Sequence, residues 1–332
     1  MILSMLLGAA AIAAGAGEAG MGVIAAGQQA AMGRFLSFTR VQESSADQAC
    51  ATYLSRAGLS GRGSLAFFER LQDLEFRMNI AQDNGYQRTH PVNGERIAAL
   101  ETRYQADPAW DRATDPAVEA RFLRVRGKLA GYVDDPALVL RRFPTSDRSI
   151  QARYARAYAY HRTGHPAEAG AEVAALVAGA PHDPYFLELQ GQVLLETGRP
   201  AEAVTVLREA VHRSNDAPLI ATLLGHALIS TEDPANFAEA KRVLRVAVGR
   251  DNDNPFAWYQ LGIVYDREGD EARAALATAE RYNLLGQPGL ALPNAEQALK
   301  TVPSGTPDWL RAQDIAMVSR TEVEKKKKNR DN

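Results

Sequence analysis

At 332 residues with 46% hydrophobic residues, the chain is long enough for two domains, or for one domain and a repeat array, each with a buried core. Its net charge of -2 at neutral pH leaves no basic footprint for a nucleic-acid partner, and its single cysteine, Cys50, excludes an intramolecular disulfide and a cysteine-built zinc site. Alanine, leucine, arginine and glutamate dominate the composition, which favours helix and an all-α fold.

Residues 1–31 are small and apolar, and three interpretations compete for them. A signal peptide needs a basic region ahead of its apolar core, and this run has none. A membrane span needs about 20 strongly apolar residues, whereas this run is interrupted by several glycines and by Glu18. The third interpretation is an Ala/Gly-rich segment that packs beside an active site, and it depends on a family resemblance given below.

Residues 35–57 carry apolar side chains at spacings of three and four, the pattern of one face of a helix. The pattern predicts that Phe38 and Cys50 belong to a buried stripe. Gly58 follows in the position where glycine commonly ends a helix.

Polar residues on and after this helix are candidates for a site. Glu43 and Asp47 lie four residues apart and therefore share a helix face. On spacing alone, such a pair is most often a solvated surface stripe. His90 precedes Pro91, which favours an extended entry to the next predicted helix, at residues 95–104. By itself, a lone histidine there is usually a cap or a core hydrogen-bonding group.

Two Asp-Pro pairs, Asp107-Pro108 and Asp115-Pro116, indicate a domain boundary. Residues 118–143 then form a predicted helical pair that is split at Asp134-Asp135-Pro136. The sequence therefore predicts a linking helical pair within residues 109–148.

A repeat of 34 residues begins after this pair. Ala157, Gly191 and Gly225 follow one another at this interval, and Trp258-x-x-Leu261-Gly262-x-x-Tyr265 is the best copy of the motif. Small residues at fixed places in a 34-residue period are typical of tetratricopeptide repeats. The interval from Gly225 to Gly262 is 37 residues, which places three extra residues around Asp233-Pro234.

The repeat predicts a helical array over residues 149–316, with Gly191, Gly225 and Gly262 at close contacts between helices. Four lysines, Lys325 to Lys328, lie in the last stretch. Residues 317–332 are predicted to be a disordered basic tail.

Several motifs together resemble the HtpX/BepA-like zinc metallopeptidases, envelope proteins in which a protease domain carries a tetratricopeptide array. They are ExxxAD at residues 43–47, Gly58, Phe67-Phe68, and THPxxxxRI at residues 89–97. The resemblance extends from about Met1 to the end of the chain. It implies the C-terminal half of a helical metallopeptidase domain at residues 1–108, followed by the tetratricopeptide solenoid.

The resemblance implies one zinc ion at an incomplete site. Glu43 corresponds to the carboxylate ligand, Asp47 to the acid that orients a metal-binding histidine from outside the ligand set, and His90 to a removable fourth ligand. The family's HExxH motif, two histidines with a glutamate base, is absent from the 332 residues. His161 and His165 are four apart, but they fall in a repeat turn. No catalytic or other cofactor-binding residue is therefore assigned.

The resemblance also implies a function in outer-membrane protein quality control, in the periplasm. Protein or peptide substrates and partners, among them the outer-membrane assembly machinery, would bind the groove of the array. The chain as given is expected to be inactive as a protease, and Met1 to be an internal methionine of a longer protein. The alternative is a non-catalytic tetratricopeptide interaction or scaffold protein.

Overall fold

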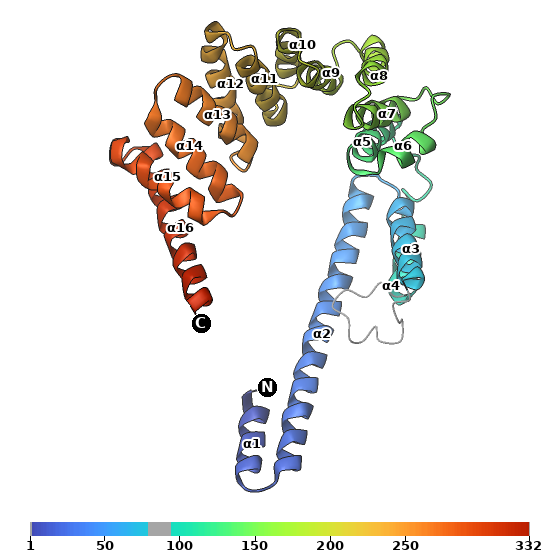
Figure 1. The fold of residues 1–332 in the computed structure, drawn as a ribbon. Coiled ribbons are helices and arrows are strands. Elements are labelled where there is room, and N and C mark those ends of the chain that lie inside the picture. The colour runs from blue at the N-terminus through green and yellow to red at the C-terminus, as the bar shows by residue number, and fades with distance from the viewer. Residues whose placement is uncertain (1, 79–93, 332) are drawn as a thin grey trace. The chain divides into compact units, whose positions relative to one another are not determined.

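The computed structural model describes residues 2–78 and 94–331, and every regular element in these ranges is a helix (Figure 1). The fold is therefore all-α, as the composition predicts. The chain divides into two compact units, Met1–Glu119 and Ala120–Asn332. None of the described helices combines the length and the hydropathy that crossing a membrane requires.

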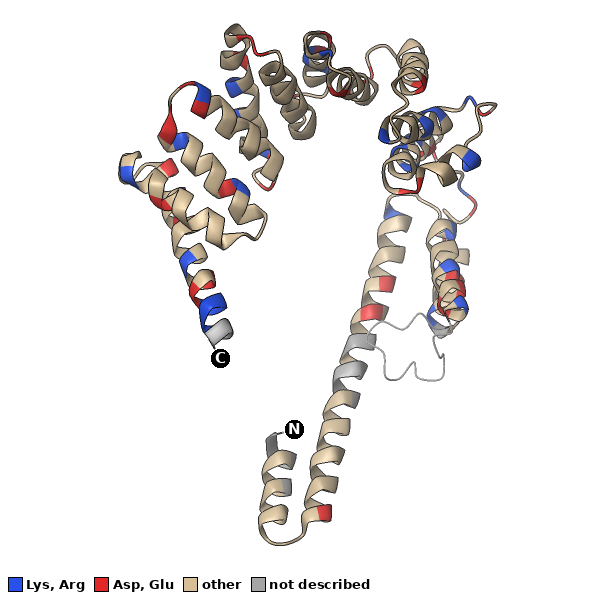
Figure 2. Cartoon of the chain, in the orientation of Figure 1, with Lys and Arg blue, Asp and Glu red and all other residues tan. Residues whose placement is uncertain are grey.

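The first unit begins with a helical hairpin. α1 (Ile2–Ala13) is followed by a turn at Gly15, and the first part of the 40-residue helix α2 (Gly17–Arg56) runs back beside it (Figure 1). Gly15 has a φ of 89°, a conformation that glycine adopts without a steric penalty. α2 begins well before the predicted start at residue 35. α1 and the first part of α2 are nearly uncharged, since Glu18 is the one charged residue between Ile2 and Gly33 (Figure 2).

The apolar stripe predicted on α2 is not its buried face. Phe38 is 64% exposed and Cys50 is also exposed. Asp47 and Ala51 are buried instead, because α4 (Gly94–Gln105) packs against that side of α2.

Gly58 follows the end of α2 with a φ of 65°, which confirms the predicted helix end. α3 (Arg62–Arg77) then packs with α2 and α4 around a small core. This core contains Ala51, Leu65, Leu100 and Tyr104. Burial raises the pKa of Tyr104, whose hydroxyl donates to Ser64 Oγ at 3.0 Å.

The second unit is built from α5 and the helices that follow it, most of which carry proline in the first turn, where its missing N–H is not needed. The bounds are α5 Pro116–Val133, α6 Pro136–Arg142, α7 Ile150–Arg162, α8 Pro166–Gly179, α9 Pro184–Glu196, α10 Pro200–Arg213, α11 Pro218–Ser230, η2 Pro234–Asn236, α12 Phe237–Arg250, α13 Pro255–Arg267, α14 Glu271–Leu284, α15 Pro288–Thr301 and α16 Pro307–Asp331.

α5 and α6 form the predicted helical pair. Asp135 separates them and caps α6, because its side chain accepts a hydrogen bond from Leu138 N at 3.0 Å. α5 contacts α7 through Gly127 and Gly131. A Cβ on either glycine would lie 2.5 Å from a backbone oxygen of α7, so neither position has room for a side chain.

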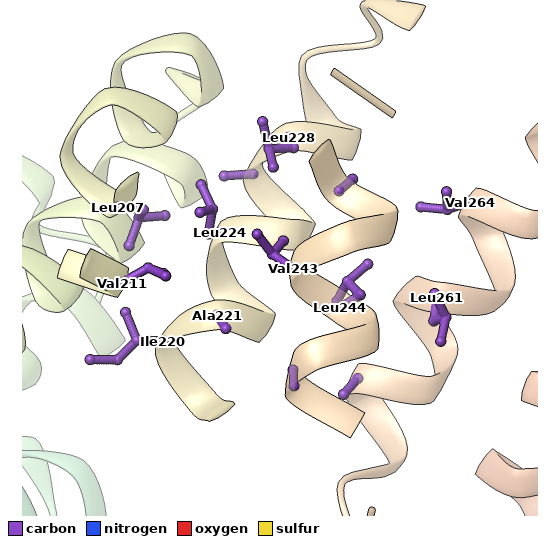
Figure 3. Close-up of a cluster of buried hydrophobic side chains, with 14 of the residues drawn as sticks. Leu207, Val211, Ile220, Ala221, Leu224, Leu228, Val243, Leu244, Leu261 and Val264 are labelled. Atoms are coloured by element: carbon purple, nitrogen blue, oxygen red, sulfur yellow. The ribbon is translucent and has the colours of Figure 1, made fainter. Parts of the chain in front are cut away.

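From α7 onward, neighbouring helices pair and stack, which confirms the predicted helical array. One cluster of buried apolar side chains extends from α9 to α14, and Leu224, Leu244 and Leu261 lie within it (Figure 3). The three extra residues predicted around Asp233-Pro234 form the short helix η2 before α12.

The last helix differs from the prediction of a disordered tail at residues 317–332. α16 is helical to Asp331, and its residues 308–328 contain neither glycine nor proline to stop it. Ser319 is buried, and Arg320 Nη2 lies 2.7 Å from Glu296 Oε1 of α15. These contacts hold the first part of the predicted tail on the array.

The three glycines predicted at close contacts are not equivalent. A Cβ on Gly191 would lie 2.4 Å from Leu207 Cγ, and one on Gly225 would lie 2.5 Å from the corresponding leucine of α12. At Gly262 the nearest atom would be Ala277 Cβ at 3.5 Å, an ordinary contact distance. Gly262 therefore has room for a methyl group, because its partner is alanine and not leucine.

We expect Gly225→Ala to lower the free energy of unfolding by about 1–3 kcal/mol, because the new methyl group overpacks a buried leucine. Gly262→Ala should leave stability unchanged or raise it by up to about 1 kcal/mol, since alanine favours helix more than glycine does. Thermal unfolding followed by circular dichroism measures both. Gly249→Ala, whose Cβ would meet nothing within 4 Å, is the control for helix propensity. Equal melting shifts at positions 225 and 262 would contradict the packing described.

Candidate functional site

Glu43 and Asp47 lie one turn apart on α2, on the side that faces α4. Asp47 is buried, with 8% of its surface exposed, and the Glu43 side chain is 22% exposed. The pair is therefore not the solvated stripe that spacing alone favours. A buried carboxylate needs a compensating cation or hydrogen bonds, and α4 supplies both.

Arg96, in the first turn of α4, joins the two acids. Its Nε and Nη2 donate to Asp47 Oδ2 and Oδ1, each at 2.8 Å, and Nη2 lies 3.2 Å from Glu43 Oε2. The hydrogen bond to Asp47 raises the pKa of the guanidinium above its ordinary value. Bidentate pairs of this kind are among the strongest polar contacts in proteins. The triad Glu43–Asp47–Arg96 therefore ties α4 to α2.

The sequence pattern alone assigns no role to Arg96. It appears there only as the arginine of the THPxxxxRI motif, which places it just after a proline-led helix entry. Nothing in that spacing indicates its partner, because Asp47 lies 49 residues earlier in the chain.

The structure describes His161 and His165 but not His90. His90 lies outside the described residues, so its predicted approach to Glu43 stays a prediction. His161 and His165 lie at the end of α7 and before α8, in the predicted repeat turn. His161 Nε2 contacts Glu196 at 2.8 Å, and His165 Nδ1 contacts Thr163 Oγ1 at 3.0 Å.

The described side chains of the triad do not by themselves fit a zinc ion. Zinc in proteins takes three or four ligands, usually with nitrogen or sulfur among them, and the triad offers only carboxylate oxygens. Across residues 2–78 and 94–331, no group of three or more His, Cys, Asp and Glu side chains is placed to hold a metal ion. Arg96 also compensates the charge of Glu43, so a metal ion at that carboxylate would have to share it with a guanidinium.

We expect Arg96→Gln to lower the free energy of unfolding by about 3 kcal/mol, because it leaves the buried Asp47 without its cation. Adding Asp47→Asn should recover part of the loss, with a coupling free energy of roughly 1–3 kcal/mol. Urea unfolding of the two single variants and the double variant measures this coupling.

The exposed ion pair between Arg62 and Asp111, with side chains 56% and 82% exposed, is the matched control. The same substitutions there should show a coupling below about 1 kcal/mol. Couplings of equal size in the two pairs would contradict a structural role for the triad.

The second unit offers a different kind of site. A groove of about 660 Å³ is lined by residues of α5, α7, α9, α11 and α13, among them Tyr132, Tyr158 and Leu219. Its volume is in the range of ligand-binding clefts, and its lining is mostly apolar with a few polar groups. Such a surface is suited to binding rather than to chemistry.

Comparison with known proteins matches two parts of the chain to two different protein families. Residues 1–104 match the model of Peptidase family M48, and residues 154–218 match a tetratricopeptide repeat model. A stretch of 226 residues is 24% identical to the beta-barrel assembly-enhancing protease of Yersinia pestis and covers 66% of this chain and 45% of that protein. The chain thus spans about half the length of this curated relative.

Two solved structures of helical proteins are also similar to the chain. YrrB, described as a TPR protein with an unusual peptide-binding site, is 16% identical with a TM-score of 0.40, covering 55% of this chain and 92% of YrrB. MamA 41-end from Desulfovibrio magneticus RS-1 is 18% identical with a TM-score of 0.38, covering 58% of this chain and 97% of MamA. From the two family matches, the chain carries a Peptidase family M48 segment at its N-terminus, followed by tetratricopeptide repeats.

Proposed function

We propose that this protein acts in the quality control of outer-membrane proteins in the periplasm, as a zinc metallopeptidase-family protein whose repeat array holds polypeptide substrates or partners. The observation that carries the proposal is the presence, in one chain, of an M48 segment and a tetratricopeptide array. The likeness to a Yersinia pestis protein named a beta-barrel assembly-enhancing protease supports the link to β-barrel assembly. The proposed division is a peptidase part at residues 1–108, a linking pair at 109–148 and the array at 149–316.

Within the peptidase part, we propose Glu43 as a carboxylate ligand of zinc, His90 as a removable ligand, and Asp47 as an acid outside the ligand set. In a complete site, these residues would help to hold a zinc ion, which would supply Lewis-acid chemistry for hydrolysis. The 332 residues contain no HExxH motif to supply two nitrogen ligands and a general base. The chain as given is therefore proposed to be inactive as a protease.

A second candidate function is a non-catalytic interaction protein. The triad favours it, because Arg96 pairs with both Glu43 and Asp47 and so joins α4 to α2 through side chains alone. In this case the M48 segment is a structural part, and only the array contacts partners. The two candidates differ in what the peptidase part does once HExxH ligands are supplied.

We expect the purified 332-residue chain to contain far less than one zinc ion per molecule and to cleave casein no faster than a chelator-treated sample. The physical reason is that carboxylate ligands alone hold zinc weakly, and that a missing general base costs roughly 10²–10⁴-fold in rate. Elemental analysis and a fluorescent casein assay measure the two quantities. Stoichiometric zinc with chelator-sensitive cleavage would sink the proposal that this chain is inactive.

A chain extended at Met1 by an HExxH-bearing helix from an M48 relative should gain both zinc and casein cleavage. The matched control replaces the glutamate of that motif by glutamine, which should keep the zinc but lose the cleavage, since the glutamate serves as base. An extended chain that binds zinc no better than the original would favour the non-catalytic candidate.

The proposed location is tested by fractionating the native host. The protein should appear in the periplasmic or outer-membrane fraction, and its deletion should lower the amount of folded outer-membrane barrel proteins. Recovery only with cytoplasmic markers would reject the envelope function while leaving the peptidase question open.

A further inference from the structure

The groove in the second unit has an exposed apolar lining that the array itself does not cover. On α5, Val125, Leu129 and Tyr132 are 52%, 55% and 62% exposed, and their spacing of four and three puts them on one helix face. Further along the groove, Leu219 of α11 and Phe256 of α13 are 63% and 44% exposed. Apolar side chains gathered on one exposed surface commonly mark a binding site.

The aromatic side chains of the groove are held in place by one another. The Tyr132 ring meets the Tyr158 ring edge to face with centroids 6.0 Å apart, and His226 meets Phe256 in the same way at 5.4 Å. Burial raises the pKa of Tyr158 and lowers that of His226. Both rings are therefore uncharged at neutral pH and add apolar surface to the lining.

The groove lining has more carboxylates than lysine or arginine side chains. Lys128 Nζ contacts Glu188 Oε2 at 2.8 Å, so this ammonium is already paired. Glu196 has no such cation: its contacts are His161 Nε2 at 2.8 Å and an amide hydrogen bond from Gln192 at 3.0 Å. Its side chain is 52% exposed. The lining thus places a carboxylate beside an apolar surface. It contains no unpaired ammonium or guanidinium group with which a ligand could pair.

We propose that this groove binds a polypeptide segment that carries two or three large apolar side chains and an adjacent lysine or arginine, with the cation pairing to Glu196. The inference rests on the proposed function, since it names the class of polypeptide that the array takes. The apolar side chains of the segment cover Leu129, Tyr132 and Leu219.

The charge pattern disfavours other segments. An acidic segment, or one that ends in a free carboxylate, meets no available cation because Lys128 is held by Glu188, and it is repelled by Glu196. A polar segment without large apolar side chains leaves the exposed lining uncovered and loses the main source of affinity.

The test uses fluorescein-labelled peptides of about 12 residues and fluorescence anisotropy with the full chain. The first peptide carries two leucines, one phenylalanine and two lysines; the second has glutamates in place of the lysines; the third has serines in place of the apolar residues. The first should bind about fivefold or more tightly than either of the others, and salt should reduce its advantage over the glutamate peptide.

Two groove variants locate the site. Leu219→Ser should weaken binding of the lysine peptide by roughly tenfold, since it removes a large apolar contact. Glu196→Gln should weaken it by about two- to fivefold and leave the glutamate peptide unchanged or bound more tightly. Leu310→Ser and Glu322→Gln change exposed residues of α16 outside the groove lining and should have no effect. Circular dichroism checks that all four variants fold.

Equal affinity for the lysine and glutamate peptides, or binding that neither groove variant weakens, overturns the inference while the proposed function stands. Failure of all three peptides to bind also overturns it. The proposed function is judged separately by the zinc content and casein cleavage of the extended chain, so the two failures can be told apart.

Discussion

Close approach of helices at residues without a bulky side chain is the constraint on which the repeat array depends. Gly191 accommodates the branched carbon of Leu207, and Gly225 does the same for a leucine of α12, at distances that no Cβ tolerates. Gly127 and Gly131 bring the backbone of α5 against that of α7. A single helix pair cannot bury its apolar face, so stacking at these contacts builds the continuous core. The inner groove is a consequence of the same stacking.

In the first unit, ion pairs of one guanidinium, and not small residues, hold two helices together. Arg96 makes a bidentate pair with the buried Asp47 and also reaches Glu43, so that α4 is held on α2 by the residues that the family resemblance assigns to a metal site. Two carboxylates on one buried face would repel each other without a cation. The cation here is a side chain, and any metal ion at Glu43 would share that carboxylate with the guanidinium of Arg96.

The two units thus present different chemistry. The described part of the M48 segment offers carboxylates and an arginine, and the 332 residues contain no HExxH motif. The array offers an apolar groove with one carboxylate, Glu196, that no lysine or arginine of the lining pairs. Under the proposed function, substrate capture and bond cleavage therefore depend on different units of the chain.

The sequence by itself determined the helical class, the 34-residue repeat, the three extra residues before α12 and the shared face of Glu43 and Asp47, because periodicity and turn residues act within a few positions of the chain. Only the tertiary structure decided the contacts between residues that lie far apart in the sequence. Arg96 lies 49 residues from Asp47, and the exposure of Cys50 follows from which side of α2 meets α4. Gly262 has room for a methyl group because it faces Ala277 where the earlier repeats have leucine. Local patterns place residues on helix faces, but only packing selects which face is buried and what it meets there.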